Sequence, residues 1–281
     1  MKFEKLQAIA DAVATGRASA VDRAIDAALD GETGAHWLRD LNKLRDVVRT
    51  SEPAFTVIAK GNGKLPFWAF SALPGRGYCP GAGACLQFCY SFRAWRYPAA
   101  FARQAQNAWL MQSVAGRRAI LAALDKATAR QHGVADFRLY VDGDFGSVAD
   151  VGFWMEALRD RPGLSAYGYS KSWKELLQFH NQGGDWPDNY RLNLSSGSVH
   201  ADAIRRAVGA LPITRGQFVA VEIGRKVRSS DHGNREHQAE LRAAYGRKAF
   251  TCPGKCGECT PKGHACGSDR FRGVDIIIAT H

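Results

Sequence analysis

Residues 137–159 read FRLYVDGDFGSVADVGFWMEALR, and this stretch sets the pattern for most of the chain. Its first five residues predict a strand and residues 148–159 predict a helix, because the apolar spacing changes from one part to the other. The pattern recurs, with further strands expected at 164–169, 190–194, 218–223 and 274–279 and helices at 173–181, 199–208 and 235–245. A strand at 67–71 precedes this series, after a hairpin turn at Gly61-Asn62-Gly63 that follows a strand at 55–59.

Strands that alternate with helices of about ten residues predict βα units and a parallel sheet. The fold class is therefore α/β, and the six strands counted from residue 67 favour a partial (β/α)6 barrel, with a doubly wound open sheet as the alternative. Residues 1–50 have helical spacing and predict an N-terminal helical cap on a main domain at 55–281. Functional groups are expected in the loops that follow the carboxyl ends of the strands.

Three cysteines follow the first strand of this series, namely Cys79, Cys85 and Cys89. Thiolates gathered this closely bind a soft metal ion or an iron–sulfur cluster. Three ligands leave a tetrahedral site incomplete, so the spacing favours a [4Fe-4S] cluster with one open iron. A zinc site completed by a distant residue and a set of free thiols are the alternatives.

Four more cysteines lie near the C-terminus, namely Cys252, Cys256, Cys259 and Cys266. Four thiols within fifteen residues, with glycines and prolines between them, predict a closed and structural metal knuckle. Zinc and a second iron–sulfur cluster suit it equally. His264 lies in the same loop, and it is more often an ordinary loop residue there than a replacement for one thiol. Seven cysteines are an odd number, which argues against a disulfide framework.

The chain carries a net charge of +11, and the excess lies in residues 91–130 and 225–272. Each of these segments adjoins a cysteine group, and a field of this kind favours nucleic acid as a partner. Aromatic and basic residues alternate after the first cysteine group, so Arg93, Trp95 and Arg96 are candidates for contact with nucleic acid. No stretch is long and apolar enough for a membrane span, and the start lacks the apolar centre of a signal peptide, so we expect a cytoplasmic protein.

Polar residues stand at the predicted ends of successive strands, and these are the positions at which a barrel site is built. They are Asp142 and Asp144, then Lys171, then Asn193 and Ser195, then Glu222. Lys171 is a candidate for contact with a phosphate or carboxylate of the substrate. Taken singly, a residue of this kind is more often a helix cap or a solvated loop residue than part of a site.

Several segments are similar to the phage and plasmid family called gene product 88. They are the stretch from Cys79 to Pro98, Leu139-Tyr-Val-Asp-Gly-Asp-Phe145, Ala166-Tyr-Gly-Tyr-Ser-Lys-Ser172 and the C-terminal cysteines, so that the resemblance covers about residues 55–280. It implies a protein of a mobile element and supplies no reaction. A non-enzymatic binding protein, such as a transfer-inhibition factor that contacts nucleic acid or a conjugation or host protein, fits that setting.

The first cysteine group also resembles that of radical S-adenosylmethionine enzymes, which carry three cysteines after the first strand of a partial barrel and an aromatic residue before the third, here Phe88. Their spacing is Cys-x3-Cys-x2-Cys, whereas this chain has Cys-x5-Cys-x3-Cys. The resemblance implies S-adenosylmethionine as a cofactor bound by Asp142 and Asp144. In this scheme Asn193, Ser195 and Glu222 assist in binding the cofactor, and Asp144 and Lys171 are catalytic.

Overall fold

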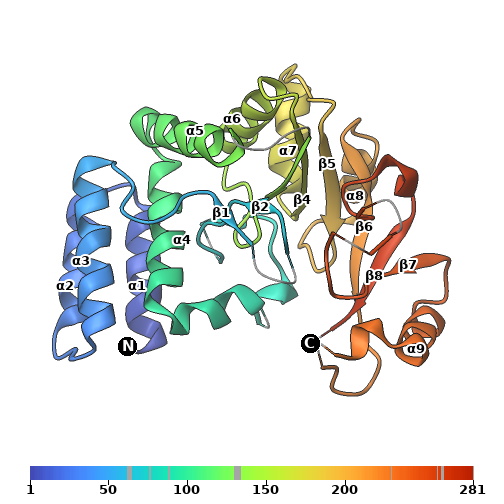
Figure 1. The fold of residues 1–281 in the computed structure, drawn as a ribbon, viewed down its shortest axis with the longest axis horizontal. Helices are drawn as coiled ribbons and strands as arrows, with labels where there is room; N and C mark the ends of the chain where they lie inside the picture. Colours follow the sequence, from blue (N-terminus) through green and yellow to red (C-terminus); the bar gives the residue numbers. More distant parts are fainter. Residues whose placement is uncertain are drawn as a thin grey trace.

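We analysed the protein as a computed structural model, which describes residues 1–61, 65–75, 77–87, 89–129, 134–228, 230–257, 259–260 and 263–280. In this part of the chain, nine α-helices and four 3-10 helices surround one sheet (Figure 1). The 3-10 helices are η1 (Ala84–Gln87), η2 (Tyr90–Arg96), η3 (Asp231–Gly233) and η4 (Asp269–Phe271). Within the described ranges, no helix is long and apolar enough to cross a membrane.

The N-terminal helices lie side by side at one end of the molecule, next to α4 (Figure 1). They are α1 (Phe3–Ala14), α2 (Ala18–Leu29) and α3 (Ala35–Thr50), and α4 spans Pro98–Leu110. Their apolar stripes meet in a core that includes Ile9, Ile25, Leu41 and Phe101, each completely buried. The same cluster continues into the residues beneath the sheet, so these helices share its core.

The apolar spacing of residues 97–130 predicts a long helical stretch with a break at Gly116. The structure instead breaks it at residues 111–113, between α4 and α5 (Val114–Thr128). Ser113 caps α5, because its hydroxyl accepts a hydrogen bond from the Gly116 N–H at 3.0 Å. Gly116 therefore lies in the first turn of α5, where a Cβ would stand 2.2 Å from the Leu110 carbonyl oxygen.

The described residues form one eight-stranded sheet in the order β1-β2-β3-β4-β5-β6-β8-β7. Only the β1–β2 pair is antiparallel, as the predicted hairpin requires. Residues 62 and 63 of its turn lie outside the described residues. The strands are β1 (Ala59–Lys60), β2 (Trp68–Ala69), β3 (Ala135–Leu139), β4 (Leu164–Ser170), β5 (Tyr190–Ser195), β6 (Thr214–Val221), β7 (Ala249–Thr251) and β8 (Asp275–Ala279).

The predicted α/β class with a mostly parallel sheet is confirmed, but the predicted partial barrel is not, because the sheet is open. Strands β2 to β6 and then β8 follow one another in sequence order, without the reversal of a doubly wound sheet. In the described part of the chain, β1 and β7 occupy the two edges and each pairs on one side only, so the sheet stays open.

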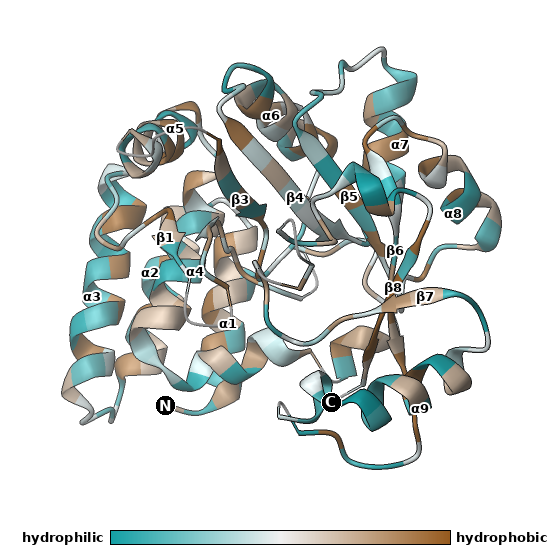
Figure 2. Ribbon diagram, turned by 45° about the vertical axis from the view of Figure 1, so that its right-hand side comes forward, coloured by the Kyte–Doolittle hydropathy of each residue, from teal (hydrophilic) through white to brown (hydrophobic). Residues whose placement is uncertain are grey.

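The helices between the strands cover one face of the sheet. They are α6 (Val148–Arg159), α7 (Trp173–Asn181), α8 (Asp202–Gly209) and, against β8, α9 (Arg235–Tyr245). Figure 2 shows hydrophobic residues along the strands and hydrophilic stripes on helices such as α3 and α9. We call the opposite face the inner face; Phe67, Tyr167, Tyr169, Phe218 and Ile276 pack there against the C-terminal cysteines.

Candidate functional site

The three-cysteine loop leaves the carboxyl end of β2 through a tight turn. Gly75 has a φ of +104°, and its carbonyl accepts a hydrogen bond from the Cys79 N–H at 2.9 Å. Cys85 lies in η1, and Cys89 immediately precedes η2. All three thiols belong to partly buried residues, and burial raises the pKa of the Cys79 thiol, with Asp144 adding to the shift. Phe88, the aromatic residue before the third cysteine, lies outside the described residues.

A second loop, which follows β5, holds the cysteine loop in place. The Gly83 N–H donates to the Gly197 carbonyl at 3.1 Å, and the Val199 N–H donates to the Gly81 carbonyl at 3.0 Å. A Cβ on Gly81 would stand 1.6 Å from the carbonyl oxygen of Lys171, so only glycine allows this approach. The cysteine loop is thus fixed across the carboxyl ends of the parallel strands, where the sequence predicted a site.

Asp144 joins the ends of β3 and β4 beneath this loop. Its carboxylate accepts hydrogen bonds from the Ser170 hydroxyl at 2.7 Å and from the N–H groups of Lys171 at 2.7 Å and Phe145 at 2.8 Å. Burial raises the pKa of Asp144, and these hydrogen bonds act in the opposite direction. Both carboxylate oxygens are therefore already engaged within the chain. Among the described residues the side chain of Asp142 has no hydrogen bond. Of the two carboxylates, Asp142 and Asp144, that of Asp142 therefore has fewer partners within the chain.

Lys171 and Ser195 lie together beside the cysteine loop, as the sequence predicted for residues at neighbouring strand ends. The Lys171 ammonium donates to the Ser195 hydroxyl at 2.6 Å, and within the described ranges it forms no ion pair. Cys79 interacts electrostatically with Lys171, and a Cβ on Gly197 would contact both Cys85 and Lys171. Ser195 also lines a hollow of about 310 Å³ that extends toward α8.

Two other predicted site residues are not brought to this place. Asn193 is completely buried, donates to the carbonyls of Gly168 at 3.1 Å and Cys266 at 3.0 Å, and accepts from Arg215 at 2.6 Å. It supports the C-terminal cysteine loop rather than the first one. Glu222 follows β6 and is exposed to solvent.

The C-terminal cysteines surround one end of the inner face. The N–H of Gly254 donates to the Cys252 sulfur at 3.4 Å, and the N–H of Ala265 donates to the Cys259 sulfur at 3.3 Å. Burial raises the pKa of Cys252 to about 11 and that of Cys266 to about 12. Amide hydrogen bonds to sulfur stabilise thiolates, and each of these thiols has at least one other thiol of the group as an electrostatic neighbour.

Both cysteine groups have the donor chemistry of metal sites, and the amide–sulfur hydrogen bonds of the knuckle fit a bound metal. Within the described ranges, however, no three His, Cys, Asp or Glu side chains lie in an arrangement that could hold a metal ion. The assignment of the seven cysteines as ligands therefore stays a prediction.

His264 fastens the knuckle to β3. Its ring packs between Phe67 and Tyr167, with ring centroids at 4.8 and 4.5 Å. Its Nδ1 accepts from the Gly267 N–H at 3.1 Å, and its Nε2 lies 3.3 Å from the Asp136 carboxylate. Both ring nitrogens have partners, so His264 acts here as a structural residue of the loop.

Charged residues that the sequence analysis did not single out lie on the inner face. Arg215 is 1% exposed and donates to the carbonyls of Phe271, Val274 and Gln217. Arg138 lies over the ring of Tyr169, 4.8 Å from its centroid. An arginine between Phe137 and Leu139 in a strand points to the face opposite its apolar neighbours, and that alternation was the available signal.

Of the three residues predicted to contact nucleic acid, one lies in the core and two lie at the surface. Trp95, expected at the surface, is 1% exposed, and its ring N–H donates to Gln104 at 2.9 Å. Arg93 and Arg96 are exposed. Arg96 lies over the ring of Tyr97, 4.9 Å from its centroid, and this ring is 56% exposed.

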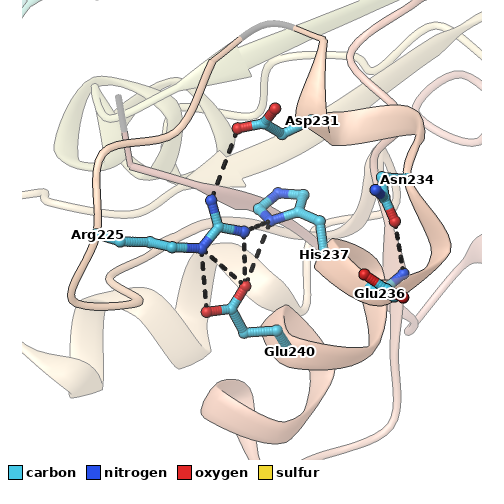
Figure 3. Close-up of a pocket in the computed structure, with 6 residues that line it drawn as sticks. All are labelled: Arg225, Asp231, Asn234, Glu236, His237 and Glu240. Carbon is cyan, nitrogen blue, oxygen red and sulfur yellow. Dashed lines mark hydrogen bonds and ion pairs between the residues drawn. The ribbon is translucent and has the colours of Figure 1, made fainter.

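A separate hollow of about 380 Å³ lies beside α9, and none of the predicted site residues lines it (Figure 3). Its charges are already paired: Arg225 contacts Glu240 at 2.7 Å and Asp231 at 3.6 Å. Asn234 caps α9 by accepting from the Glu236 N–H. Among the described residues that line the hollow, the Arg225 guanidinium therefore already has carboxylate partners.

Comparison with known proteins gives one finding. The family model of Gene product 88 matches residues 43–273, which include β2 to β7 and both cysteine groups. No curated protein and no solved structure matches the chain. Since the match covers most of the sequence, the chain belongs to the Gene product 88 family.

Proposed function

We propose that this protein is an iron–sulfur protein of a phage or plasmid, with Cys79, Cys85 and Cys89 as the ligands of a [4Fe-4S] cluster. The observation that carries the proposal is the position of the cysteine loop across the carboxyl ends of the parallel strands, fixed to the loop after β5. Enzymes built on parallel strands place their reactive groups at this edge.

The groups beside the loop suit an anionic or zwitterionic ligand. Lys171 supplies a positive charge and Ser195 a hydroxyl, and they are held together at 2.6 Å. Asp142 supplies a carboxylate that could bind an amino group, and Asp144 positions the Lys171 backbone. S-adenosylmethionine combines an amino group with a carboxylate, so it is the cofactor we propose. A cluster with an open iron supplies one electron to its bound ligand.

The second part of the proposal concerns the knuckle of Cys252, Cys256, Cys259 and Cys266. Four thiols complete a coordination sphere, so a metal there is structural, either zinc or a second iron–sulfur cluster. Amide hydrogen bonds to Cys252 and Cys259 support this role.

A non-enzymatic binding protein is the second candidate, and one observation favours it. Arg93, Arg96 and the exposed ring of Tyr90 lie in η2, directly after the cysteine loop, and the exposed ring of Tyr97 follows η2. Basic side chains beside exposed aromatic rings suit single-stranded nucleic acid, and such a surface needs no reaction. A mobile-element or host protein is the other partner that this candidate allows.

The deciding experiment is anaerobic purification of the full chain with analysis of iron, sulfide and zinc. We expect roughly four or eight irons per chain, with the loss of one cluster in Cys85→Ala. The matched control is Cys259→Ala, which should retain the first cluster and lose the metal of the knuckle. Zinc as the only metal would refute the proposal.

An enzyme of this kind would also cleave S-adenosylmethionine reductively to 5′-deoxyadenosine. Product formation that depends on Cys85 and Lys171 would support the enzyme. An intact cluster without any product would favour the binding protein instead.

A further inference from the structure

Arg138 is an unpaired cation on the inner face of the sheet. Its neighbours in β3, Phe137 and Leu139, are completely buried on the helix-covered face, so the arginine side chain points the other way. The Nε atom is buried and has no hydrogen-bond partner. Among the described residues the guanidinium forms no ion pair, and its one contact of defined geometry is with the ring of Tyr169.

Tyr167 supplies a second donor beside it. Arg138 and Tyr167 are register partners on β3 and β4, so their side chains are neighbours on the same face. The Tyr167 residue is completely buried; its hydroxyl lies near the Cys256 thiol, a weak acceptor, and within the described ranges it makes no hydrogen bond that meets the geometric criteria. Two donors on adjacent strands thus lack an oxygen acceptor at the same place.

A buried donor without a partner is unfavourable unless a ligand completes it. Arg138 as a whole is only partly buried, and its Nε is the one guanidinium nitrogen that is both buried and without a partner, so a ligand can approach the other two from solvent. Among the described residues no carboxylate pairs with it, and Asp136, the acid on the same face of β3, contacts His264. The side chains whose charges act most strongly on Arg138 are Tyr90, Tyr169, Tyr167 and Cys256, and none of them is a carboxylate.

We propose that Arg138 and Tyr167 form the binding site of an oxyanion, a carboxylate or a phosphate group. The guanidinium offers paired N–H donors to two oxygens, and the phenol adds a third donor. Tyr90 reaches the end of β3, because its hydroxyl donates to the Val141 carbonyl, so the cysteine loop borders the site on one side. Cys256 of the knuckle borders it on the other. The anion site itself does not depend on the proposed function. Only a reaction of the bound anion rests on it.

The test is a titration of the full, anaerobically purified protein with inorganic phosphate and with acetate, followed by calorimetry and by the unfolding temperature. We expect saturable binding of at least one of the two anions, and the comparison identifies the preferred group. Arg138→Met should weaken that binding at least about tenfold, since two charge-assisted hydrogen bonds are lost. Tyr167→Phe, which removes one oxygen atom and keeps the ring, should weaken it several-fold.

Arg96→Met is the matched control, because Arg96 also lies over a tyrosine ring but is exposed. It should bind the anion as the unaltered protein does. Without anion, Arg138→Met should be at least as stable as the unaltered protein, because a buried Nε donor without a partner has been removed.

Two results would overturn the proposal. One is equal anion binding by Arg138→Met and the unaltered protein. The other is an absence of saturable binding together with a loss of metal in Arg138→Met, which would show that the guanidinium offsets thiolate charge. Anion binding by a protein that contains only zinc would leave this site standing while the cluster proposal fails.

Discussion

The carboxylate of Asp144 accepts the backbone N–H of Lys171 at 2.7 Å, and this contact ties the carboxyl ends of β3 and β4 together. The same carboxylate accepts the hydroxyl of Ser170. The carbonyl of Lys171 lies against Gly81, so the cysteine loop rests on the segment that Asp144 positions. Asp144 thus connects the carboxyl ends of β3 and β4 to the loop that carries Cys79.

Replacement of this carboxylate should destabilise the protein. Asp144→Ala leaves the donors of Ser170, Lys171 and Phe145 without an acceptor, and we expect a loss of about 3 kcal/mol in the free energy of unfolding. Asp144→Asn retains one acceptor oxygen and should lose less. Urea unfolding measures both. The control is Asp125→Ala, which removes an exposed partner of Arg161 and should cost under about 1 kcal/mol. Equal losses in the two alanine variants would contradict this role.

Much of the outer layer of the fold could be predicted from the sequence. Helices α6, α7 and α9 have the expected bounds, because their apolar stripes and polar caps are local signals. Several strand predictions differ from the structure. Residues 55–58 are not a strand, β2 is shorter than predicted, β3 begins two residues and β6 four residues before the expected start, and β7 was not predicted. These limits depend on pairing with distant strands, which apolar spacing within one segment does not reveal.

The sequence predicted which site residues stand near the ends of strands, but not all of the contacts that they make. Lys171 and Ser195 meet because β4 and β5 are parallel neighbours, and that much follows from the βα pattern. Asn193 faces the same side of β5 as Ser195, but it lies two residues before the end of the strand, where Arg215 and Cys266 are its partners. Trp95 shows the same difficulty, since an aromatic residue in a basic segment has the same sequence signal in a core and at a surface.

Arg215 connects β6 to the knuckle, and its loss should be severe. Arg215→Met leaves Asn193 and the carbonyls of Phe271 and Val274 without donors in a buried place, so we expect a loss of about 3 kcal/mol or more. Arg215→Lys keeps the charge with fewer donors and should lose less. Burial lowers the pKa of Arg215, in line with its scarce access to water.

The control for this variant is Arg191→Met, which removes a partly exposed pair with Asp269 and should cost under about 1 kcal/mol. Urea unfolding again gives the comparison. A loss in Arg191→Met as large as that in Arg215→Met would show that burial does not decide the effect.

Asp269 gives a pH dependence whose sign can be worked out. Hydrogen bonds from Arg191 and then Arg272 lower its pKa below the usual value for aspartate. Its contribution to stability is therefore present above the unfolded pKa, about 3.9, and is lost as the pH falls through the lowered value. Asp269→Asn should cost under about 1 kcal/mol at pH 7, because the pair is largely exposed.

The free energies of unfolding of Asp269→Asn and the unaltered protein should converge as the pH falls below about 4. Asp185→Asn is the control, since Asp185 is 84% exposed and lies 3.6 Å from Arg159. A difference for Asp269→Asn that stays constant from pH 7 to the acid range would contradict the assigned cause.

The exposed surface of η2 leads to a prediction about nucleic acid. Arg96→Ala should reduce the salt dependence of binding to a single-stranded oligonucleotide by about one phosphate contact. Tyr97→Ala should weaken binding by about 1–3 kcal/mol through lost stacking. Fluorescence anisotropy at several salt concentrations measures both effects. Arg23→Ala removes the same charge from an exposed position on α2 and should change neither quantity. If Arg23→Ala and Arg96→Ala lose affinity equally, the net charge of the protein, rather than the η2 surface, drives the binding.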